Sequence, residues 1–141
     1  VLFVFAHGWQ NDIPSSRDFT ARLIKGILAR AARDGVPVES LGFLAVHWDS
    51  KRLVFHESAL NAEVIGRKRI APFLGKLAAT APATKVVMVG HSLGGRLTLA
   101  ALNASTGTIH GAVLLEAAAD LDCLLPEKNH EAPGCFPLAP H

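Results

Sequence analysis

The sequence lacks several features that define whole classes of protein. No apolar run approaches the roughly 18 residues that a membrane-spanning helix needs, so we expect no transmembrane segment. Lysine and arginine number 14 against 12 aspartates and glutamates, and no aromatic residues interleave the basic ones, which argues against nucleic acid as a partner. Cysteine occurs only at Cys123 and Cys135, which fit a disulfide in a secreted protein and two thiols in a reducing compartment equally well. The localisation therefore stays open.

Metal-ligand patterns are also missing. His47 and His56 are the pair that comes nearest to one, but neither has a cysteine or carboxylate partner at ligand spacing. We therefore expect no metal site.

What the sequence does have is a large apolar fraction, arranged in short runs. Half of the 141 residues are hydrophobic, enough for one domain with a buried core. Four of the runs are typical of strands that are buried on both faces, and helical patterns separate them. We expect these strands at residues 1–6, 41–46, 86–89 and 111–115. Alternating strands and helices predict an α/β fold with a right-handed parallel sheet.

Three helices are expected between these strands. The first begins with Ser15 as N-cap and ends before Gly35. The second covers Glu57–Ala81, where Pro72 predicts a kink or a junction of two helices. Its sheet-facing side chains are expected to be Leu60, Val64, Ile70, Phe73, Leu74 and Leu77. The third helix begins at Leu93. Because the chain opens inside a strand, we expect residues 1–141 to be one domain of a longer protein, without its first and last strands.

The stretch Gly90-His91-Ser92-Leu93-Gly94 joins the third strand to the third helix. A serine on such a sharp turn takes a strained backbone conformation that exposes its hydroxyl, so the positions two before and two after it must lack bulk. Gly90 and Gly94 meet that need. The amides at the start of the following helix can stabilise negative charge on a substrate oxygen, and Leu93 provides the first of them. The pattern predicts that Ser92 is a nucleophile.

Together with His7-Gly8-Trp9 after the first strand, this turn makes the chain resemble an α/β-hydrolase of the lipase/esterase type. The resemblance implies a three-layer α/β/α sandwich, truncated here, and it places the second oxyanion-hole amide on Trp9. Gly8 would let the backbone approach the substrate closely. Trp48, after the second strand, would line the acyl pocket, although a core or rim position is an equal alternative.

The family's order of catalytic residues is serine, then acid, then histidine. Glu116, at the end of the fourth strand, and Asp120, in the alanine- and aspartate-rich stretch that follows, are equal candidates for the acid, with Asp122 as a close rival. The histidines after Ser92 are His110, His130 and His141, and we expect the base to lie beyond them.

Two histidines flank the expected site without a catalytic assignment. His7 is expected to tie down its own loop through a hydrogen bond, and His91 to lie beside the nucleophile and point away from it; both are taken as part of the substrate-binding region. The predicted activity is hydrolysis of a small-molecule carboxylic ester or thioester through an acyl-enzyme, with no cofactor. An inactive binding module, and a hydrolase or acyltransferase that acts on another acyl substrate, are the alternatives.

Overall fold

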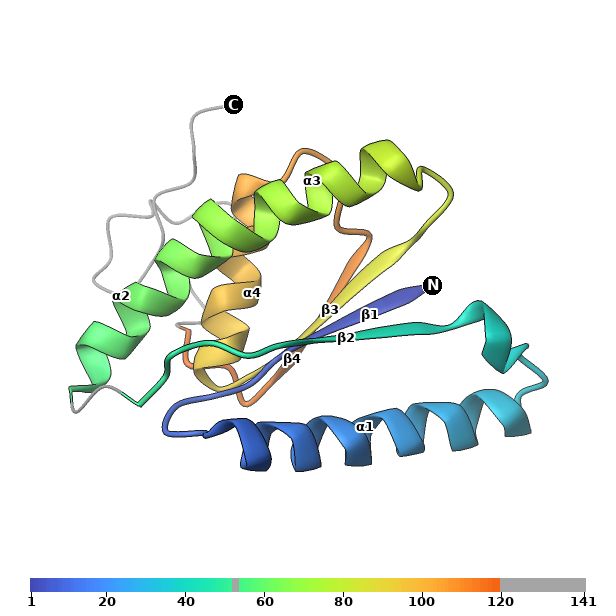
Figure 1. Ribbon diagram of the computed structural model, residues 1–141, viewed down its shortest axis with the longest axis horizontal. Coiled ribbons are helices and arrows are strands. Elements are labelled where there is room, and N and C mark those ends of the chain that lie inside the picture. Colours follow the sequence, from blue (N-terminus) through green and yellow to red (C-terminus); the bar gives the residue numbers. More distant parts are fainter. Residues whose placement is uncertain (52–53, 120–141) are drawn as a thin grey trace.

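The computed structural model describes residues 1–51 and 54–119. Strands and helices alternate along the chain, as the sequence predicts (Figure 1). The strands are β1 (Leu2–Ala6), β2 (Gly42–Val46), β3 (Val86–His91) and β4 (Gly111–Leu115). The helices are α1 (Ile13–Arg33), α2 (Phe55–Ile65), α3 (Ala71–Thr80) and α4 (Leu93–Ala104), with a 3-10 turn at Val38–Ser40 and a π-helical turn at Gly66–Ile70.

The four strands form one parallel sheet in the order β2-β1-β3-β4. Ala6, the last residue of β1, pairs with Val46 of β2 and with Gly90 of β3. Because the strands are parallel and in this register, the loops that follow them start side by side at one edge of the sheet. The described loops in which the sequence predicts site residues therefore begin at that edge.

Helices cover both faces of the sheet, which makes the predicted three layers. Helix α1 lies on one face, and α2, α3 and α4 lie on the other (Figure 1). The core between α4 and the sheet is closed to solvent: Val4, Met88, Leu93 and Leu97 are each 0% exposed. The fold class predicted from the sequence is confirmed.

The start of α1 differs from the prediction. Asp12, not Ser15, is the N-cap, and its carboxylate accepts a hydrogen bond from the Ser15 N–H at 2.9 Å. Pro14 falls in the first turn, where the missing N–H has no intrahelical partner to lose. The Ser15 side chain, the Ser15 N–H and the neighbouring Lys51 together lower the pKa of Asp12 to about 2.

The segment after β2 has the predicted junction but a different buried face. Helix α3 begins at Ala71, directly after the π-helical turn, and Pro72 lies in its first turn. The prediction that Leu60, Val64 and Phe73 face the sheet is wrong, because these side chains are 48%, 49% and 46% exposed. The buried side chains of α2 are small instead: those of Ser58, Ala59 and Ala62. They let the helix backbones approach more closely than leucine or phenylalanine would.

Gly66 packs directly against the backbone of α4. A Cβ atom on Gly66 would collide with the Leu97 carbonyl oxygen and would lie 2.9 Å from the Ala100 Cβ. The contact selects glycine at this position for steric reasons and fixes how the α2 layer lies on α4.

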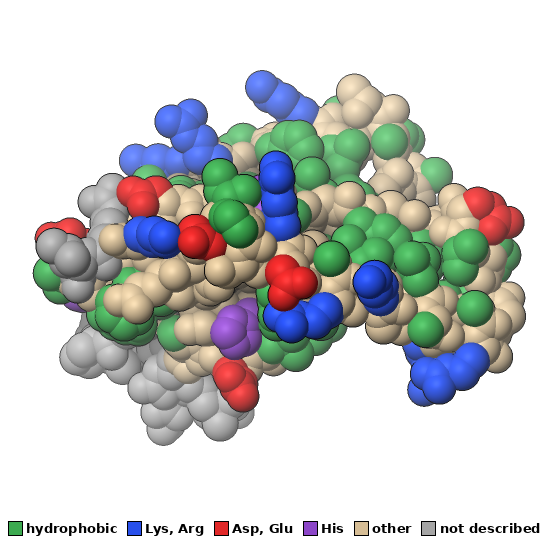
Figure 2. All heavy atoms as spheres, turned by 60° about the horizontal axis from the view of Figure 1, so that its bottom comes forward, with side chains coloured by type: hydrophobic (Ala, Val, Ile, Leu, Met, Phe, Trp, Pro, Cys, Tyr) green, Lys and Arg blue, Asp and Glu red, His purple; other side chains and the backbone are tan. Residues whose placement is uncertain are grey.

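The face on which α1 lies carries charges of both signs (Figure 2). Two of its ion pairs are helical i,i+4 pairs: Arg22–Asp18 at 2.8 Å and Arg30–Asp34 at 2.6 Å. In the described part of the chain, no helix is both long and apolar enough to cross a bilayer.

Candidate active site

Ser92 occupies the strained turn between β3 and α4. Its φ of 53° and ψ of −121° lie in a region that residues with side chains rarely adopt, at a cost of about 1–3 kcal/mol. A Cβ atom on Gly94 would collide with the Ala6 carbonyl oxygen, and one on Gly90 would lie 2.6 Å from the Thr98 hydroxyl. The two glycines are therefore required by contacts with β1 and α4, and the serine between them remains partly exposed at the sheet edge.

Three hydrogen bonds hold the main chain of Ser92. Its N–H donates to the Leu115 carbonyl at 3.0 Å, and its carbonyl accepts from the Gly95 N–H at 2.9 Å and the Ala118 N–H at 3.0 Å. Two of these three bonds come from the end of β4 and the residues just after it. This segment, although it starts 23 residues beyond the serine in sequence at Leu115, is thus part of the structure that maintains the turn.

The loop after β1 passes directly beside the serine. A Cβ atom on Gly8 would lie 2.9 Å from the Ser92 Cβ and 3.1 Å from Nδ1 of His91. Trp9 is the next residue, and its ring packs edge-on against Phe55 with centroids 5.3 Å apart. On the other side, Leu93 is the first residue of α4, a position whose N–H has no intrahelical acceptor. Of the two residues predicted for the oxyanion hole, Leu93 directly follows Ser92, and Trp9 directly follows Gly8, which lies beside the serine.

His7 holds the loop after β1 to the loop after β2. Its Nδ1–H donates to the Gly8 carbonyl at 3.0 Å, and its Nε2 accepts from the Trp48 N–H at 3.2 Å. Burial is the main reason that the pKa of His7 is lowered, and nearby His47 lowers it further. Both ring nitrogens of His7 are therefore engaged by main-chain groups, one in each loop.

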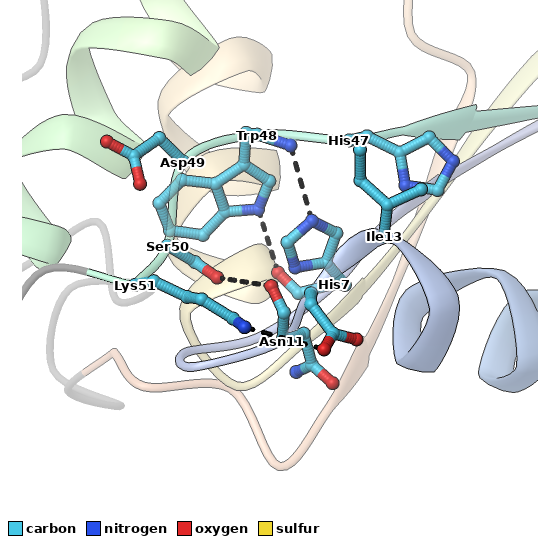
Figure 3. Close-up of a pocket in the computed structure, with 9 residues that line it drawn as sticks. His7, Asn11, Ile13, His47, Trp48, Asp49, Ser50 and Lys51 are labelled. Atoms are coloured by element: carbon cyan, nitrogen blue, oxygen red, sulfur yellow. Dashed lines mark hydrogen bonds and ion pairs between the residues drawn. The ribbon is translucent and has the colours of Figure 1, made fainter.

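Trp48 is buried in the core and also lines a cavity at this edge of the sheet. It is 8% exposed, stacks on the His7 ring with centroids 5.5 Å apart, and donates its indole N–H to the His7 carbonyl at 3.0 Å. Figure 3 shows this arrangement at the wall of a cavity of about 390 Å³. His47 and Lys51 also line the cavity, so its surface is mixed polar and apolar.

Of the carboxylates predicted as the catalytic acid, only Glu116 lies among the described residues. Glu116 follows β4 and adopts a positive φ of 46°. Its side chain is 90% exposed, and its Oε2 lies 3.7 Å from Nε2 of His91. His91 thus turns toward Glu116 and toward the Phe19 ring of α1, whose centroid is 5.3 Å away. Asp120 and Asp122 lie outside the described residues.

The histidine that would complete the site is not among the described residues that follow Ser92. His110 is the only histidine of that group, and its Nδ1 accepts from the N–H of Val86, at the start of β3. Ser92 follows the opposite end of that strand. At a rise of about 3.3 Å per residue, the chain from Val86 to Ser92 spans about 20 Å. His110 is therefore excluded as the base. His130 and His141 lie outside the described residues.

Comparison with known protein families agrees with this geometry. The model of the alpha/beta hydrolase family matches residues 3–140. The chain belongs to the alpha/beta hydrolase family. A search of curated proteins finds no match. Within residues 1–51 and 54–119 of this α/β hydrolase, no three His, Cys, Asp or Glu side chains gather in a way that could hold a metal ion.

Sequence reasoning missed a second set of bonds, which holds the loop after β1 of this α/β hydrolase to the loop after β2. Ser50 is 1% exposed; its carbonyl accepts from the Gln10 N–H at 3.1 Å, and its hydroxyl donates to the Asn11 carbonyl at 3.3 Å. Gln10 adopts a positive φ of 55°, so these bonds fix a strained residue next to Trp9. The only signal for these bonds in the sequence was the polar composition of the loops after β1 and β2.

Proposed function

We propose that this α/β hydrolase is a serine hydrolase that cleaves carboxylic esters of small molecules. The observation that carries the proposal is the position of Ser92: it lies on a strained turn, partly exposed, between the start of α4 and the loop of Gly8. A serine in that position can be reached by a substrate carbonyl, and the proposal assigns the main-chain N–H groups of Leu93 and Trp9 as the donors that stabilise the carbonyl oxygen.

In the proposed reaction, the Ser92 Oγ attacks the ester carbonyl carbon while a histidine accepts the hydroxyl proton. The negative charge that develops on the carbonyl oxygen is stabilised by the main-chain N–H groups of Leu93 and Trp9. Collapse of the tetrahedral intermediate expels the alcohol, which takes the proton from the histidine. Water then attacks the acyl-enzyme by the same sequence and releases the acid and the free serine.

The acid that orients the histidine is proposed to be Glu116 or Asp120. The high exposure of Glu116 does not favour it, because an acid that fixes a histidine tautomer works best when it is shielded from water. The base itself is proposed to lie beyond His141.

Hydrolysis of simple esters by the full-length protein tests the proposal. p-Nitrophenyl esters of increasing acyl length would be compared for the wild type and Ser92→Ala. We expect turnover with the wild type and a loss of about 1,000-fold or more with the variant. Equal rates for the two proteins would refute the proposal and leave the fold as a binding module. The chain-length series measures which acyl group the site prefers.

A further inference from the structure

The guanidinium of Arg96 lies at the meeting point of three segments. Arg96 is the fourth residue of α4; its Nε donates to Oε1 of Glu63 on α2 at 2.8 Å, and its Nη2 lies 2.6 Å from the same oxygen. Its Nη1 donates to the Ala118 carbonyl at 3.4 Å. The side chains of Arg96 and Glu63 are only 15% and 18% exposed. A charge pair so shielded from solvent interacts more strongly than one on the surface.

Ala118 connects this ion pair to the nucleophile. Its carbonyl accepts from Arg96, and its N–H donates to the Ser92 carbonyl at 3.0 Å. The chain around it packs tightly against α4, since a Cβ atom on Gly95 would lie 2.5 Å from the Ala117 Cβ. The guanidinium and the strained serine are therefore joined through one residue, by hydrogen bonds to its two main-chain polar groups.

We propose that Arg96 is a positioning residue for the nucleophile, acting through Ala118, an inference that rests on the proposed function. The strained backbone of Ser92 persists only if its surroundings fix it. The carbonyl of Ser92 depends on Ala118 for one of its two bonds, and Ala118 in turn is anchored by Arg96. The planar guanidinium can bind Glu63 and Ala118 together, whereas a lysine ammonium has no such fork.

Fluorophosphonate inactivation of the full-length protein separates this role from simple stabilisation. For Arg96→Gln we expect the first-order rate constant of inactivation to fall roughly 10- to 100-fold, with little change in the half-saturating probe concentration, because the serine is displaced and the pocket is not. For Arg96→Lys the rate constant of inactivation should lie between those of the wild type and Arg96→Gln. The matched control is Arg30→Gln, which breaks the exposed pair with Asp34 at the C-terminal end of α1 and should react like the wild type.

A charge exchange provides the sharpest comparison. In the double variant Glu63→Arg/Arg96→Glu the ion pair between α2 and α4 is kept, but a carboxylate faces the Ala118 carbonyl and cannot donate to it. We expect thermal stability to recover toward the wild-type value while inactivation stays slow. Recovery of both would reduce Arg96 to an ion-pair partner and overturn the proposal, as would an Arg96→Gln variant that reacts at the wild-type rate.

Amide hydrogen exchange distinguishes failure of this inference from failure of the proposed function. Without Arg96, the N–H of Ala118 should exchange faster than in the wild type, whether or not the protein reacts with the probe. A wild type that resists the probe refutes the proposed function. Unchanged exchange in Arg96→Gln refutes the inference about Arg96.

Discussion

Gly8 and Ser92 lie so close that a Cβ atom on the glycine would be 2.9 Å from the serine Cβ. The sheet register explains this contact: Ala6 of β1 pairs with Gly90 of β3, so the residues two positions further along each chain emerge side by side. One parallel pairing thus brings together the loop of Gly8 and the turn of Ser92, which are more than 80 residues apart in the sequence.

The variant Gly8→Ala should impair catalysis through this contact. The added methyl group also meets the His91 carbonyl oxygen at 3.2 Å, so the loop must move away from the serine and take Trp9 with it. Loss of one oxyanion donor costs about 100- to 1,000-fold in rate, and we expect kcat for ester hydrolysis to fall in that range.

Gly26→Ala is the control for that substitution. Gly26 lies in α1, and no atom comes within 4 Å of the place that an added methyl group would occupy. The change should therefore leave kcat unaltered and add about 0.5–1 kcal/mol to the free energy of unfolding. If Gly8→Ala hydrolysed esters as fast as Gly26→Ala, the close approach of the loop would not matter for the reaction.

The packing of the π-helical turn on α4 leads to a stability prediction. Gly66→Ala places a methyl group against the Leu97 carbonyl and should lower the free energy of unfolding by about 1–3 kcal/mol. Gly75→Ala, in α3 with open space around it, should raise it by about 0.5–1 kcal/mol. Urea denaturation measures both. Shifts of the same sign would show that Gly66 is not confined by α4.

His7 makes stability depend on pH in a defined direction. Burial lowers the pKa of His7 in the folded protein, so below its ordinary value of about 6.5 the unfolded chain binds the proton first. The free energy of unfolding should therefore decrease as the pH falls from about 7.5 to about 5.5. The variant His7→Gln should show a weaker decrease than the wild type.

The exposed His56 is the matched histidine for this experiment. The variant His56→Gln should keep the pH dependence of the wild type, because its ring makes none of the buried contacts that His7 makes. Should the two variants lose the same share of the pH dependence, His7 would not be its source.

The strands, their parallel arrangement and the turn at Ser92 could be predicted from the sequence because each depends on neighbours in the chain. A continuous apolar run indicates a strand buried on both faces, and two glycines around a serine indicate a turn with no room for side chains. The structure supplies the partners that take up that room: the Ala6 carbonyl faces Gly94, and the Gly94 carbonyl faces Gly90.

Features that depend on a distant partner could not be predicted. Helical spacing suggested that Leu60 and Val64 would be buried, but the buried positions of α2 hold small residues such as Ala59 and Ala62, and Gly66 lies against the backbone of α4. The pairing of Glu63 with Arg96 links positions 33 residues apart, for which a single sequence carries no signal. Asp12 and Ser15 are both suitable N-cap residues for α1, and only the structure shows that the Asp12 carboxylate accepts from the Ser15 N–H.

Mass spectrometry of the full-length protein after reaction with a fluorophosphonate tests the central claim most directly. The account predicts one adduct, on the peptide that contains Ser92, and no adduct on Ser92→Ala. An adduct on another serine, or none on a correctly folded wild type, would contradict the assignment of Ser92 as the nucleophile.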